Sequence, residues 1–205
     1  MYRWYRLVFT DLYPTTDIWK YRSMADLLVP WKNEVNRFRI VSNPEVTDFY
    51  IGSSGMESMG MMKSFFRRLY DLKLELMEDD MDEPRPEKIY ILYPKRSMRP
   101  SFSSSLIQNL SNMHTISGRE VVTDIGMFRS GKDRILAGLR IGTFSDEHLS
   151  GAEKAFADRL MKRFSQQTGI RVKEIRRPGV FHLSRGFEPY RLINLVRVPE
   201  DEDEP

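Results

Sequence analysis

The stretch EVVTDIGMFRSGKDRILAGLRIGTF, residues 120–144, decides the fold expected for this chain. Its two halves, 120–128 and 134–144, are rich in β-branched and other apolar residues, and the polar segment between them contains a glycine. Two such runs joined by a short polar loop predict a β-hairpin. A second hairpin is predicted at 37–41 and 46–51, where a Ser-Asn-Pro turn separates two short runs. Consecutive strands joined by short turns indicate an α+β protein with antiparallel pairing.

Three further segments show the three-and-four spacing of amphipathic helices. The first begins at Asp17 and continues past Pro30 to Val35 with a kink, the second follows Gly55 as far as Leu76, and the third is capped by Ser145 and ended by Gly169. A weaker helix is predicted at 101–117. The expected fold is therefore α+β, with mainly antiparallel sheet and two or three long amphipathic helices packed on one face. The remaining predicted strands are 2–9, 88–93, 171–175, 180–183 and 190–198.

The order of the predicted elements is compatible with two similar halves that meet near residue 85. Residues 79–87 are acidic and contain Pro84 and Pro86, so they are predicted to form an exposed connection and a candidate internal boundary. Residues 1–198 are predicted to form a single compact α+β domain, because the chain is long for one small domain and short for two large ones. Residues 199–205 are predicted to be an acidic, flexible tail.

Composition excludes several classes of site. The chain has no cysteine, so it has no disulfide, thiolate zinc site, iron–sulfur cluster or cysteine nucleophile. Its three histidines, His114, His148 and His182, are widely spaced, and we expect no metal site and no cofactor. No signal peptide is evident and no apolar run is long enough to cross a bilayer. These features predict a soluble intracellular protein, cytoplasmic or nuclear, with no transmembrane segment.

Two glycine-containing segments resemble phosphate-binding loops in composition. Residues 126–133 (GMFRSGKD) match the start of a P-loop, but Asp133 replaces the required Ser or Thr and the next segment alternates as a strand. A hairpin turn is the better interpretation. Residues 52–55 (GSSG) lie between a predicted strand and a predicted helix, where free backbone amides could bind an anion. Small residues at such a junction more often only turn and cap the chain.

The two triplets at His148 and His182, each of the form His-Leu-Ser, suggest one enzymatic alternative. Two histidines acting as acid and base would suit a phosphodiester-processing enzyme centred on His182. However, His148 falls in the first turn of a predicted helix rather than on a strand. We therefore predict a non-enzymatic protein and keep this activity as an alternative.

The charge distribution carries the main functional hypothesis. Residues 171–197 are strongly basic and contain aromatic residues, whereas residues 199–205 hold five carboxylates. The overall net charge of +3 therefore conceals a body of about +8. Cations and stackable rings on neighbouring strands and loops are typical of RNA and single-stranded nucleic acid binding. The predicted nucleic-acid-binding residues are Arg171, Lys173, Arg176, Arg177, Phe181, His182, Arg185, Phe187, Arg191 and Arg197, together with Lys95, Arg96 and Arg99 of a basic loop.

The partner is thus predicted to be nucleic acid, with RNA as the first choice. The same basic surface also fits a structural, adaptor or matrix-like assembly protein that binds an acidic protein partner. In that alternative the chain could associate with itself as a homo-oligomer.

Overall fold

The computed structural model describes residues 2–8, 30, 34–70, 73–77, 81–93, 109–111, 113, 115, 118–130 and 134–175. Two helices and eight strands have defined bounds within these ranges. In chain order they are β1 (Arg3–Val8), β2 (Val35–Ser42), β3 (Thr47–Ser53), α2 (Met56–Tyr70), β4 (Lys73–Leu76), β5 (Arg85–Tyr93), β6 (Val121–Ser130), β7 (Arg134–Thr143), α5 (Gly151–Thr168) and β8 (Arg171–Glu174).

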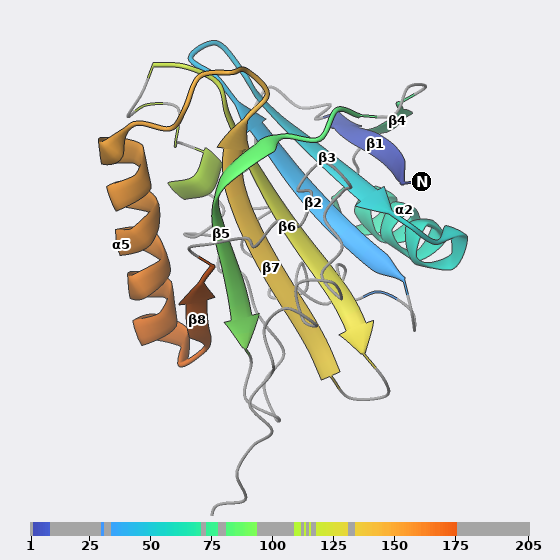
Figure 1. Ribbon diagram of the computed structural model, residues 1–205. Coiled ribbons are helices and arrows are strands. Elements are labelled where there is room, and N and C mark those ends of the chain that lie inside the picture. Colours follow the sequence, from blue (N-terminus) through green and yellow to red (C-terminus); the bar gives the residue numbers. More distant parts are fainter. Residues whose placement is uncertain are drawn as a thin grey trace, which may run out of the picture.

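The eight strands form one sheet in the order β4-β1-β3-β2-β6-β7-β5-β8, and every neighbouring pair is antiparallel. Strands β4 and β8 lie at its two ends, with α5 alongside β8 (Figure 1). The first half of the chain supplies β1 to β4 and the second half supplies β5 to β8. Read inward from each end of the sheet, the strands of both halves lie in the order fourth, first, third, second. This is the strand order of a ferredoxin-like unit. The halves meet where β2 pairs with β6, and Arg39 lies opposite Asp124 in that register.

Alternation along the strands separates an apolar face from a charged one. Phe38 and Ile40 of β2 belong to a buried cluster that also includes Met62 of α2 and Phe164 of α5. Both helices therefore pack on the same face of the sheet. The residues of β2 that alternate with Phe38 and Ile40 point to the opposite face, among them Arg37 and Arg39. We call this the helix-free face because neither α2 nor α5 packs on it.

The predicted fold, with two or three long amphipathic helices packed on one face of the sheet, is wrong in its share of helix, because sheet dominates the described residues. The described residues form mainly an eight-stranded antiparallel sheet, and α5 is its main helix. The second predicted helix ends at Tyr70, and residues 73–76 form strand β4, which pairs with β1. The apolar residues Leu72, Leu74 and Leu76 fit both a helical and an alternating pattern, and pairing with β1 decides between them because Leu74 reaches the core opposite Leu7.

The boundaries of the third predicted helix are corrected at one end and confirmed at the other. Its N-cap is Ser150 rather than Ser145, because Ser150 and Glu153 form a reciprocal capping box. Gly169 adopts the left-handed conformation with φ 71° and ends the helix as predicted.

Both predicted hairpins are present, as β2–β3 and β6–β7. Strand β5 begins at Arg85, so part of the predicted acidic connection belongs to the sheet. Most of the predicted helix at 17–35, the core of the predicted helix at 101–117, the predicted strands at 180–183 and 190–198, and the tail lie outside the described residues.

Gly142→Ala is expected to destabilise the fold by about 1–3 kcal/mol or more, because the strands leave no room for a side chain there. A Cβ at Gly142 would lie 1.9 Å from the carbonyl oxygen of Arg85, beside the irregularity of β5 between Pro86 and Lys88. The free energy of unfolding, measured in urea, tests this. Gly60→Ala is the matched control: a Cβ at Gly60 in α2 meets nothing within 4 Å, so we expect stabilisation by about 0.5–1 kcal/mol. Equal effects of the two substitutions would contradict the packing described.

Candidate functional site

Two of the predicted nucleic-acid-binding residues, Arg171 and Lys173, lie in the described part of the chain, on strand β8. The others lie outside the described residues: Arg176, Arg177, Phe181, His182, Arg185, Phe187, Arg191, Arg197, Lys95, Arg96 and Arg99. The proposed convergence of the whole set is therefore a prediction that the structure does not test.

Arg171 and Lys173 are exposed and point to the same side of β8. Their strand pairs with β5, where Lys173 lies opposite Ile91. Val172 between them packs against the core under the helices, so the two cations project on the helix-free face. The alternation of the sequence predicts this arrangement correctly, because side chains two residues apart in a strand share a face.

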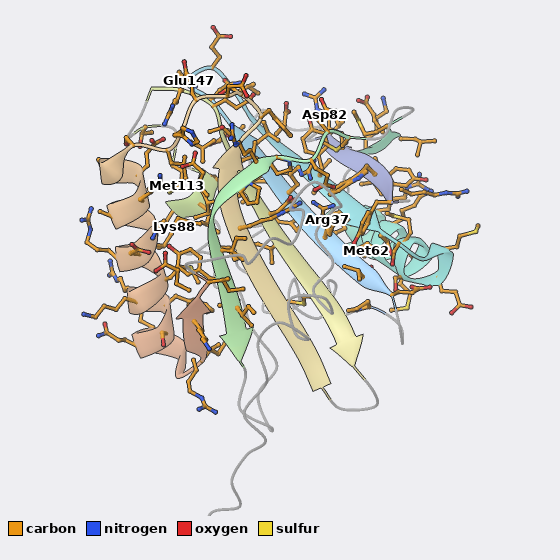
Figure 2. All side chains as sticks on the ribbon, viewed as in Figure 1. Arg37, Met62, Asp82, Lys88, Met113 and Glu147 are labelled. Carbon is orange, nitrogen blue, oxygen red and sulfur yellow. The ribbon has the colours of Figure 1, made fainter. Side chains whose placement is uncertain are left out.

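Helix α5 contributes three more exposed cations at the same end of the sheet: Arg159, Lys162 and Arg163. Their spacing of three and four residues places them together on the outer side of the helix, away from the buried residues Met161 and Phe164. Figure 2 shows nitrogen-tipped side chains projecting outward from α5. We call Arg159, Lys162, Arg163, Arg171 and Lys173 together the basic edge.

The carboxylates nearest to the basic edge are bound to another cation. Lys88 of β5 lies between α5 and the sheet (Figure 2), where its Nζ donates to both oxygens of Asp158 at 2.9 Å and to Glu174 at 2.5 Å. Burial opposes its charge, but the hydrogen bonds to Glu174 and Asp158 prevail and raise the pKa of Lys88. The Tyr90 hydroxyl also donates to Asp158, at 2.6 Å, and burial together with this bond raises the pKa of Tyr90.

As a result, no cation of the basic edge pairs with a carboxylate among the described residues. Among the described residues of α5, β5 and β8 at this end of the sheet, Lys88 adds a sixth cation, against the two carboxylates that it binds. The cations of the basic edge are presented to solvent by two adjacent elements rather than by one strand. Sequence reasoning missed the contribution of α5, although the spacing of Arg159, Lys162 and Arg163 opposite an apolar stripe was a readable signal.

A second group of charges lies on the helix-free face at the junction of the two halves and is buried. It consists of Arg37, Arg39, Asp124, Arg140 and Glu83, which we call the arginine cluster. Asp124 Oδ2 accepts from Arg37 at 2.6 Å, from Arg39 at 3.0 Å and from Arg140 at 2.7 Å, and its Oδ1 accepts from Arg39 Nε at 2.9 Å. Glu83 accepts from Arg37 at 2.6 and 3.0 Å and also from Arg140.

Burial and charge act in opposite directions on the carboxyl groups of the cluster. The side chains of Arg37, Arg39 and Asp124 are 0% exposed. Burial alone would raise the pKa of Asp124, but Arg37, Arg140 and Arg39 hold it far below its usual range. Burial likewise opposes the charge of Glu83, and its bonds to Arg37 and the charge of Arg140 still lower its pKa.

Aromatic rings flank the guanidinium groups of the cluster. The Cζ atom of Arg37 lies 4.8 Å from the ring centroids of both Tyr2 and Trp4, and that of Arg39 lies 4.6 Å from Trp4. Trp4 itself is buried. These cation–π contacts fix the planes of the guanidinium groups, so the cluster is a preorganised set of donors.

The alternating sequence Arg37-Phe38-Arg39-Ile40 was the signal for this cluster. In β2, Phe38 and Ile40 are buried on the helix side, so the two arginines must share the other face. A lone Asp124 inside the apolar run 121–127 was the matching signal in β6. Neither indicates burial of the charges, because that depends on which strands become neighbours.

The glycine-containing segments do not form phosphate-binding loops. The carboxylate of Glu34 occupies the space beside Gly55 and accepts from the backbone amide of Ser58 at 3.1 Å. The start of α2 is thus capped by the chain's own carboxylate. Residues 126–130 lie in strand β6, which pairs with β7 as far as Ser130 and Arg134. The next element after β6 is therefore a strand and not the helix that a P-loop requires.

The described part of the chain contains no acid–base pair of histidines. The side chain of His148 is 65% exposed, and its Nδ1 lies 3.4 Å from Glu87 Oε1. His182 lies outside the described residues, so the phosphodiester-processing hypothesis stays untested. Among the described residues, no group of three or more His, Asp and Glu side chains is placed to hold a metal ion. No described helix is long and apolar enough to cross a bilayer.

Comparisons with known proteins do not assign a family. No protein family and no curated protein matches the sequence. Among solved structures, one similar chain is titled "Crystal structure study of anthrone oxidase-like protein"; it is 13% identical, with 78% of this chain and 85% of that chain covered, at a TM-score of 0.26. A similarity at that level supports no statement about the fold or function of this protein.

Proposed function

We propose that this protein is a non-enzymatic nucleic-acid-binding protein, with RNA as its first ligand, and that the basic edge contacts the phosphates. The observation that carries the proposal is the set of five exposed cations on α5 and β8 that pair with no described carboxylate. Cations free of internal partners can neutralise phosphates and release counterions, which is the main source of affinity for nucleic acids. The nearby carboxylates would otherwise repel the ligand, but Lys88 already binds them.

The paired variant Arg171→Gln, Lys173→Gln is expected to weaken binding of a short single-stranded RNA and to reduce its salt dependence. Each lost phosphate contact on a single strand lowers the log–log slope of affinity against salt by about 0.7, so the pair lowers it by about 1.4. Fluorescence anisotropy over about 50 to 200 mM salt measures both effects.

Lys73→Gln is the matched control for this experiment. Lys73 is also an exposed cation on an end strand, but it lies on β4 at the opposite end of the sheet and pairs with Glu75 at 3.2 Å. Its replacement should leave the slope unchanged. Binding that is independent of salt, or an equal loss in the control, would contradict the proposal. If no RNA binds and the protein self-associates or binds an acidic protein, the adaptor alternative replaces it.

A further inference from the structure

Strand β4 forms the end of the sheet opposite to the basic edge (Figure 1). It pairs with β1 on one side, and no strand among the described residues pairs with its other side. Leu76 at its end is 55% exposed, although it points to the same side of the strand as the buried Leu74. An edge strand presents unpaired backbone groups to which a strand of another chain can be added.

The hydrogen bonds between β4 and β1 determine which backbone groups face this outer edge. The backbone amide of Met77 donates to the carbonyl oxygen of Trp4 at 3.0 Å, in register with the pairing of the two strands. Hydrogen-bonded and non-hydrogen-bonded pairs alternate along antiparallel strands, so the odd-numbered residues of β4 direct their backbone groups to β1. The amides and carbonyl groups of Leu74 and Leu76 therefore point to the outer edge.

The charges of β4 are complementary to those of a second copy of the same strand. The side chains of Lys73 and Glu75 are 65% and 44% exposed. In an antiparallel pair of two β4 strands centred on Leu74, the two Leu74 residues exchange both hydrogen bonds, and Lys73 lies opposite Glu75 on each side of them. Pairs centred on Lys73 or on Glu75 would instead place like charges opposite each other, which is destabilising. A lysine on an edge strand usually hinders pairing with other chains, but here it favours one register.

The same register gives the exposed Leu76 an apolar neighbour. Leu76 lies diagonal to Leu74 of the second copy, on the same face of the extended sheet and within reach of a long side chain. The pairing is isologous, because each copy contributes the same surface, and it closes after two copies.

We propose that this protein forms a two-fold symmetric dimer through antiparallel pairing of its β4 strands, centred on Leu74, which continues the sheet of one copy into that of the other. Two pairs between Lys73 and Glu75 fix the register of this interface. The basic edge lies at the far end of the sheet in each copy, so the dimer does not depend on the proposed RNA binding.

Two charge reversals test the proposed pairing. Lys73→Glu places carboxylates opposite each other and Glu75→Lys places ammonium groups opposite each other, so each variant alone should dimerise at least about tenfold more weakly than the unmodified protein. Sedimentation equilibrium at a series of concentrations measures the dimerisation constant of the 24.2 kDa chain. An equimolar mixture of the two variants restores both unlike pairs and should associate at least as tightly as the unmodified protein. The double variant Lys73→Glu, Glu75→Lys exchanges the two charges and should also dimerise.

Asp146→Lys is the matched control. It makes the same change of charge as Glu75→Lys, on a fully exposed side chain between β7 and α5, and should leave the dimerisation constant unchanged. An unmodified protein that stays monomeric at millimolar concentration would overturn the proposal. So would single variants that dimerise as tightly as the unmodified protein, or failure of both the mixture and the double variant to associate. A mass that keeps rising beyond that of two chains would also overturn it, because a symmetric pair has no further β4 edge to offer.

Discussion

Asp124→Asn is expected to lower the free energy of unfolding by about 3–5 kcal/mol, because it leaves buried arginines without their shared counter-charge. The amide keeps the size of the side chain but can accept through one oxygen only, whereas the carboxylate accepts from Arg37, Arg39 and Arg140 through both. Among the described residues, the carboxylate of Glu83 would then be the remaining anion beside the three guanidinium groups. Urea unfolding at neutral pH measures the loss.

Asp48→Asn is the control, because it makes the same chemical change in a pair near the surface. Asp48 accepts from Arg6 at 2.7 Å, and the Arg6 and Asp48 side chains are 42% and 23% exposed. Water screens such a pair, so its loss should cost less than about 1 kcal/mol. A cost for Asp124→Asn as small as that of the control would show that the arginine cluster contributes no buried ion pair to the folded state.

The strands could be predicted from the sequence where the local residue pattern and the pairing of strands in the sheet favour the same structure. The hairpin of 120–144 is visible because alternation, β-branched residues and the glycine-containing turn all indicate the same structure. The prediction of a helix over residues 72–76 is wrong for the opposite reason. The leucines of this segment fit both a helical and a strand periodicity, and the pairing of β4 with β1 at the start of the chain makes the segment a strand. Long-range pairing of that kind leaves no mark in a short window of sequence.

The candidate sites also divide into features that the local sequence predicts and features that depend on long-range strand pairing. The shared face of Arg171 and Lys173 follows from the period of two in a strand, and it could be predicted. The arginine cluster requires β2 of the first half to pair with β6 of the second, which places Arg39 opposite Asp124. Each of these residues alone resembles an ordinary surface charge. Their burial becomes visible only when the order of the eight strands is known.

The stability of the protein is expected to fall as pH decreases below about 4, and the arginine cluster should contribute a large share. The pKa of Asp124 is far below its usual range in the folded protein, whereas an unfolded chain binds this proton near pH 3.9. The folded-state pKa is the lower one, so the stability from this group is fully present above about pH 5 and is lost as pH falls. The loss approaches about 1.4 kcal/mol per pH unit below pH 4. Glu83, whose pKa is also lowered, adds a smaller loss of the same sign.

Comparison with Asp124→Asn isolates the Asp124 contribution, since asparagine has no proton to bind. The difference in unfolding free energy between the two proteins should be about 3–5 kcal/mol at neutral pH and should narrow by about 1.5 kcal/mol between pH 4 and pH 2.5. Urea unfolding at a series of pH values measures both curves. The pair Asp48→Asn and unmodified protein provides the baseline for a carboxylate near the surface. A difference that stays constant down to pH 2.5 would mean that Asp124 takes up its proton equally in the folded and unfolded states, and that the three arginines do not hold it ionised.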